Sequence, residues 1–80
     1  MAEGTSARPD RAALAHNVRR LRFGRGWSQE ELAAFAGERR QAMISEIETA
    51  TANPTLDTLE HIATALGVRV YDLLRPLRVR

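Results

Sequence analysis

The sequence predicts an all-α fold of five short helices, on the strength of three observations. Apolar residues recur every three or four positions through most of the chain, the spacing that gathers them on one face of a helix. Residues able to cap a helix, such as Ser28 and Thr55, stand directly before two of these stretches. Glycines, such as Gly37 and Gly67, stand directly after them, where helices commonly end.

The first two helices follow from these signals. Asp10 is expected to cap a helix that ends near residues 24–26 and whose apolar stripe is Leu14, Val18 and Leu21. Ser28 and Glu31 form a capping box for a second helix, Gln29–Ala36, and Trp27 and Leu32 take the positions of a hydrophobic staple. The apolar positions of this second helix are Leu32, Ala33, Phe35 and Ala36.

Three further helices follow. The third spans about Arg40–Thr49, with Ile44 and Ile47 facing inward and Met43 beside them, and a loop from Ala50 to Pro54 comes next. Thr55 caps the fourth helix, which Gly67 ends and whose apolar residues are Leu56, Leu59, Ile62, Ala63 and Leu66. The fifth helix, Val70–Leu74, ends before Pro76.

Length and composition favour one small domain. Eighty residues bury only about 60% of the surface of the unfolded chain, so we expect a partner subunit to add stability. The absence of cysteine excludes disulfides and thiolate-bound zinc, and we expect no metal and no cofactor. No apolar run has the length of a signal peptide or a bilayer span, so we expect a cytoplasmic protein without a membrane partner.

Three regions are expected along the chain. Residues 1–9 are small and polar and predict a flexible N-terminal arm, and residues 10–75 hold every periodic segment. Residues 76–80 form a C-terminal tail, in which residues 77–80 alternate apolar and charged side chains. Such a short terminal run is expected to fray, and pairing with a partner chain is the alternative.

The basic residues are all arginine and are concentrated in the first half of the chain, although the net charge is only +2. Such a distribution indicates a surface that attracts a polyanion, and solvated helix faces are the alternative explanation. The arginines of the first half are Arg8, Arg11, Arg19, Arg20, Arg22, Arg25, Arg39 and Arg40.

Nothing in the sequence indicates an enzyme. His16 lies off the apolar stripe of its helix, and His61 has no cysteine or second histidine near it in the sequence. Glu30 and Glu31 are acids favoured by the start of a helix, and no nucleophile has a partnered base.

Residue identities at fixed spacing resemble the lambda-repressor-like, or Cro/C1-type (XRE family), helix-turn-helix domain. The resemblance runs from about Leu14 to Leu74. It rests on Val18-Arg19, Leu21-Arg22, Gly26-Trp27-Ser28-Gln29-Glu30, Leu32-Ala33, Ala36-Gly37, Ile44-Ser45, Ile47-Glu48, Asn53-Pro54-Thr55-Leu56, Leu59, Ile62-Ala63, Ala65-Leu66-Gly67-Val68 and Leu73-Leu74.

The resemblance implies a five-helix DNA-binding domain whose third helix lies in the major groove of double-stranded DNA. The residues then expected to face base edges are Gln41, Ala42, Ser45 and Glu46. Those expected to contact the DNA backbone are Gln29, Arg39, Arg40, Thr49, Thr51 and Asn53. Arg22 and Glu48 resemble the internal ion pair of the family.

Three departures from the family pattern qualify these expectations. One extra residue stands between Gly37 and Ile44, which makes the register of Gln41 uncertain by one. Ala50 replaces the glycine that commonly follows the reading helix, so either the helix continues or alanine adopts a left-handed conformation. The loop from Thr49 to Asn53 lacks arginine and lysine, which predicts a shallow dependence of binding on salt.

The function implied is that of a sequence-specific transcriptional regulator, a repressor that binds a pseudo-palindromic operator as a homodimer. The alternative is an antitoxin whose main ligand is a toxin protein and which regulates its own operon. Prophage repressors and controllers of restriction–modification genes use the same domain. The dimer surface is expected at the end of the chain, at Tyr71, Leu74, Leu77 and Val79.

Overall fold

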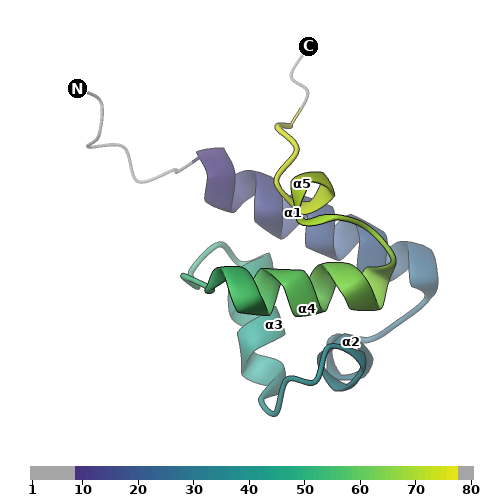
Figure 1. Ribbon diagram of the computed structural model, residues 1–80. Helices are drawn as coiled ribbons and strands as arrows, with labels where there is room; N and C mark the ends of the chain where they lie inside the picture. Colours follow the sequence, from purple (N-terminus) through teal and green to yellow (C-terminus); the bar gives the residue numbers. More distant parts are fainter. Residues whose placement is uncertain (1–8, 78–80) are drawn as a thin grey trace.

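The computed structural model describes residues 9–77 and confirms the all-helical fold (Figure 1). The helices are α1 (Pro9–Arg25), α2 (Gln29–Phe35), α3 (Gln41–Glu48), α4 (Leu56–Leu66) and α5 (Val70–Leu73). In Figure 1, α2 and α3 lie on one side of α4, and α5 lies on the opposite side, next to α1. The expected arm, apart from Pro9, and the last three residues of the tail, including Val79, lie outside the described residues.

One fully buried side chain from each helix meets in the centre of the molecule. These side chains are Val18, Leu32, Ile44, Ile62 and Leu73. Burial of each contributes roughly 1.5 to 3 kcal/mol, so the core depends on all five helices together. None of the described helices is both long enough and apolar enough to cross a lipid bilayer.

The start of α1 differs from the prediction. The helix already begins at Pro9, so Asp10 lies inside the first turn and does not cap it from outside. Proline suits the first turn because the amide proton that it lacks has no partner there. The Asp10 carboxylate is favoured at this position by the positive end of the helix dipole.

The start of α2 has the predicted capping box. Ser28 Oγ accepts a hydrogen bond from the Glu31 amide at 3.0 Å, and Glu31 Oε1 accepts one from the Ser28 amide at 2.8 Å. Leu32 is buried, and Trp27 packs against the core. The two hydrogen bonds of the capping box therefore fix where α2 begins.

Two residues placed on apolar stripes are largely exposed. Phe35 is 62% exposed because it lies about 60° away from Leu32 around the helix, on the side opposite Ala36, and it stacks on Trp27 with ring centroids 4.4 Å apart. Leu56 is 62% exposed because it is the first residue of α4. The core-facing stripe of α4 begins at Leu59 instead.

Four helices end in the same left-handed turn. The positive φ angles lie at Gly26, Gly37, Ala50 and Gly67. After α3, the Thr51 amide donates to the Glu46 carbonyl at 2.9 Å and the Ala50 amide donates to the Ile47 carbonyl at 3.1 Å, which is a Schellman motif. Ala50 has a φ of 62°, so the helix does not continue and alanine adopts the strained conformation.

Two polar side chains that sequence reasoning did not single out join distant parts of the chain. Asn17 is 5% exposed, and its Nδ2 donates to the Leu73 carbonyl at 2.9 Å and the Arg75 carbonyl at 3.0 Å. Arg25 Nη2 donates to the Leu66 carbonyl at 3.0 Å. These bonds connect α1 to the end of α5 and to the end of α4.

Candidate nucleic-acid interface

The outer face of α3 presents the four residues expected to face base edges. Gln41, Ala42 and Glu46 are exposed and Ser45 is half-buried, whereas the inward side chains of this helix are in the core. The period of the helix separates the two sets, because Ile44 and Ile47 point to α1 and α2 while the residues between them point to solvent. Met43 is partly buried against the core.

The turn between α2 and α3 accommodates the extra residue of this chain. Gly37 has a φ of 75°, Glu38 is half-buried, and Arg39 and Arg40 are exposed. Because α3 begins at Gln41, the additional residue lies in the turn and Gln41 is the first residue of the helix. Arg40 precedes the helix and provides no side-chain cap, so the first amides of α3 face outward without one.

Arg22 and Glu48 form a buried, bidentate ion pair that joins α1 to the last turn of α3. Arg22 Nε lies 2.7 Å from Glu48 Oε2, and Arg22 Nη2 lies 2.9 Å from Glu48 Oε1. Arg22 Nη1 also donates to the Trp27 carbonyl at 2.8 Å. The hydrogen bonds that Arg22 donates to the Glu48 carboxylate raise the pKa of Arg22, and burial opposes this shift only in part.

A chain of hydrogen bonds runs from this ion pair to the exposed start of α3. Gln29 Nε2 donates to Glu48 Oε1 at 3.0 Å, and Gln41 Nε2 donates to Gln29 Oε1 at 3.2 Å. Gln29 is half-buried at the start of α2, so it connects the buried carboxylate to the exposed amide. Sequence reasoning missed this role because Glu48 lies 19 residues from Gln29.

The carboxylate of Glu48 sets the orientation of the side-chain amides of Gln29 and Gln41 in this series of hydrogen bonds. A carboxylate only accepts hydrogen bonds, so Gln29 must turn its NH₂ group toward Glu48 and its oxygen toward Gln41. Gln41 therefore donates one N–H to Gln29, and its side-chain oxygen and second N–H stay free. One acceptor beside one donor matches the N6 and N7 edge of adenine in the major groove.

The opposite end of α3 uses its polar side chains differently. Thr49 Oγ1 lies 3.1 Å from the Ser45 carbonyl and 3.2 Å from the Glu46 carbonyl, and Thr51 Oγ1 lies 3.2 Å from the Glu46 carbonyl. The two hydroxyls also lie 3.0 Å apart. They cap the helix end, while Asn53, further along the loop, is exposed.

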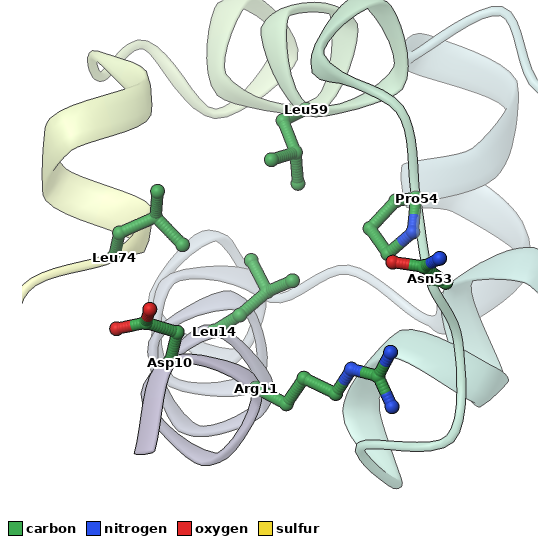
Figure 2. Close-up of a pocket in the computed structure, with 7 residues that line it drawn as sticks. All are labelled: Asp10, Arg11, Leu14, Asn53, Pro54, Leu59 and Leu74. Carbon is green, nitrogen blue, oxygen red and sulfur yellow. The ribbon is translucent and has the colours of Figure 1, made fainter. Parts of the chain in front are cut away.

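A hollow of about 370 Å³ separates the start of α1 from the loop between α3 and α4 (Figure 2). Its apolar lining comes from Leu14, Pro54, Leu59 and Leu74. Figure 2 shows the Arg11 side chain extending toward Asn53, whereas Asp10 lies on the other side, near Leu74. Sequence reasoning did not place Arg11 at this loop.

Within residues 9–77 no three histidine or acidic side chains come together in a way that could hold a metal ion.

Comparison with known proteins decides the family. A family model described as Helix-turn-helix matches residues 18–73, which extend from the middle of α1 through α5. The chain belongs to this helix-turn-helix family. Its members matched here are transcriptional regulators, so the chain falls in the class of DNA-binding regulators of Cro/C1 type and not among enzymes.

Relatives in several bacteria share most of this chain. A hypothetical transcription factor from Neisseria meningitidis is 46% identical over 70 residues, which cover 88% of this chain and 65% of that protein. Control protein C.BamHI from Bacillus amyloliquefaciens is 38% identical over 64 residues, which cover 80% of this chain and 79% of that protein.

Solved structures show the same fold. The crystal structure of the Neisseria transcription factor superposes with a TM-score of 0.80 at 45% identity and covers 84% of this chain and 76% of that chain. The restriction-modification controller protein C.AhdI from Aeromonas hydrophila superposes with a TM-score of 0.75 at 30% identity, over 80% of this chain and 96% of that chain. The helix-turn-helix consists of α2, the turn after Gly37, and α3.

Proposed function

We propose that the chain is a sequence-specific repressor that binds a pseudo-palindromic operator as a homodimer. The start of α3 enters the major groove, where its exposed side chains reach base edges. The residues that contact bases are Gln41, Ala42, Ser45 and Glu46. Those that contact the DNA backbone are Gln29, Arg39, Arg40, Thr49, Thr51 and Asn53.

The observation that carries this proposal is the hydrogen-bond chain from the buried ion pair to Gln41. An exposed amide at a helix start is otherwise free to rotate, whereas the Gln41 amide donates to Gln29, whose own amide is oriented by its bond to Glu48. A group fixed before binding loses less conformational entropy on contact with DNA. The side chain of Gln29 positions Gln41, and its backbone amide, at the start of α2, is left for a phosphate.

The homodimer is proposed through α5 and the residues that follow it. Tyr71 and Leu77 are 66% and 42% exposed, and Leu74 is half-buried beside them in the sequence. Burial of these side chains against a second copy would remove apolar surface from water. Two copies also multiply the few base pairs that one domain can distinguish.

Selection from a pool of random DNA duplexes tests the proposal. We expect the purified protein to enrich one palindromic sequence and to bind it in a complex that contains two copies of the chain. Replacement of Gln41 by Ala should lower affinity by about 5- to 150-fold for the enriched duplex. The same replacement should have little effect on a duplex in which the contacted adenine pair is changed. Failure to enrich any sequence over random DNA at physiological salt would overturn the proposal.

A second measurement addresses the protein partner. Mass measurement of the complex isolated from its native cell distinguishes a second copy of this chain from a foreign protein. A foreign protein in place of the second copy would support the antitoxin alternative. Transcription from a promoter that carries the enriched sequence should fall when the protein is present, and a rise would make it an activator.

A further inference from the structure

The loop that follows the reading helix is poorly equipped to hold DNA phosphates by itself. Residues 49–55 include no arginine or lysine. The Thr49 and Thr51 hydroxyls already contact carbonyls of α3. Neutralisation of phosphates beside this loop therefore requires cations from another part of the molecule.

Two arginines of α1 flank this loop. Arg11 lines the hollow that also contains Asn53 and Pro54 (Figure 2). Arg19 lines a second hollow of about 310 Å³, together with Thr49 and Ala50 at the end of α3. The wall of the second hollow on α1 consists of the small residues Ala12 and Ala15 with His16 and Arg19.

The charges around both arginines leave them available to an anion. No carboxylate within residues 10–77 forms an ion pair with Arg11 or Arg19. Glu48 lines the second hollow, but Arg22 holds its carboxylate. Asp10 lines the first hollow on the side of Leu74, away from the loop (Figure 2).

We propose that α1 supplies the cationic phosphate contacts that the loop lacks, through Arg11 and Arg19. The two residues are eight positions apart, or about 12 Å along the helix, whereas successive phosphates of one strand rise by about 3.4 Å along the DNA axis. The arginines therefore reach different phosphates. This inference rests on the proposed function, and it reverses the shallow salt dependence expected from the loop alone.

The salt dependence of binding tests the inference. Affinity for the duplex enriched by the wild-type protein is measured between 50 and 200 mM salt for R11A, R19A, the double variant and R20A. Arg20 is the matched control because it is an exposed arginine of the same helix that lines neither hollow. Each of R11A and R19A should reduce the slope of log affinity against log salt by about 0.9, and the double variant by about twice that. R20A should leave the slope unchanged.

The outcomes separate this inference from the proposed function. Over this salt range each lost contact makes the fall in affinity about 3-fold smaller, and the ratio of affinities for enriched and scrambled duplexes stays constant. If the wild-type protein prefers its duplex but R11A and R19A keep the wild-type slope, the inference is wrong and the proposed function stands. An equal effect of R20A also overturns it, because the charge would then act without a defined contact. If the wild-type protein prefers no duplex, both are overturned.

Discussion

The reading helix α3 and the scaffold helix α4 are held in different ways. Thr55 caps α4, with its Oγ1 accepting from the Thr58 amide at 3.1 Å, and Gly67 ends it in a left-handed turn. By contrast, α3 begins after Arg40, which gives no side-chain cap, and the turn that follows it places Ala50 at a φ of 62°. The local signals that define α4 are absent or strained in α3.

Since α3 has fewer favourable local signals than α4, its position depends more strongly on tertiary contacts. The Arg22–Glu48 pair holds the last turn of α3, and Ile44 and Ile47 fix its inner face in the core. Local rules are commonly broken at functional sites and compensated elsewhere in the structure. Because α3 has no side-chain cap at its start, its first amides are available for another molecule.

The largest expected effect comes from removal of the Glu48 carboxylate, which holds the last turn of α3. Glu48→Ala should lower the free energy of unfolding by about 3 to 5 kcal/mol, because it leaves the Arg22 guanidinium buried without its partner. Urea denaturation measures the change. Replacement of both residues by Met is the control and should recover most of the loss. A loss below about 1 kcal/mol for Glu48→Ala would show that α3 does not depend on the pair.

The next test concerns the end of α4. A Cβ at Gly67 would lie 2.7 Å from Arg25 Nη2 and would require alanine at a φ of 76°. We expect Gly67→Ala to destabilise the protein by about 2 kcal/mol, through backbone strain and loss of the bond from Arg25 to the Leu66 carbonyl. Gly37→Ala is the matched control, because its φ is 75° with no atom near the new Cβ. It should lose about 1 kcal/mol, and an equal loss in both variants would exclude a role for Arg25.

The starts of the two helices give a smaller effect. Thr55→Ala should lower stability by about 1 kcal/mol because the Thr58 amide loses its acceptor, and Thr55→Ser should retain most of it. Arg40→Ala, at the equivalent position of α3, should change the free energy of unfolding by less than about 0.5 kcal/mol, measured by thermal denaturation. Equal losses at the two positions would contradict the contrast.

The smallest expected effect has the opposite sign. Ala50→Gly should stabilise the protein by about 0.5 kcal/mol, because relief of the left-handed strain exceeds the added entropy of the unfolded chain. Ala34→Gly, inside α2, is the control and should destabilise it by about 1 kcal/mol. Thermal denaturation of the wild type and the two variants measures these changes in stability. A loss of stability in Ala50→Gly would show that the turn after α3 is not strained.

Sequence signals predicted the helices best where local chemistry decides. The box at Ser28 and Glu31, the cap at Thr55 and the stop at Gly67 are all present, since each depends on residues within one turn. At Ala50 the pattern offered two outcomes, because helix continuation and a strained turn differ by only about 1 to 2 kcal/mol.

Apart from the Arg22–Glu48 pair, which the family resemblance implied, the contacts between distant residues escaped prediction. Asn17 bonds carbonyls 56 and 58 residues away, and nothing in the local sequence distinguishes it from a solvated asparagine. Phe35 and Leu56 fit the apolar period, yet both are exposed, Phe35 because it lies at the edge of its stripe and Leu56 because it is the first residue of α4. For the candidate site, spacing indicated which residues face outward, but the link from Glu48 to Gln41 through Gln29 required the packing of α2 on α3.

The two hydrogen bonds that Asn17 donates to the Leu73 and Arg75 carbonyls have a further consequence for operator geometry. They fasten the segment after α5 to the same helix that carries Arg22, so no linker separates the proposed dimer contact from the groove-reading unit. In such a dimer the distance between the two α3 helices is fixed. One extra base pair between half-sites turns the second by about 35°. The protein should therefore reject spacers of altered length even when both half-sites are intact.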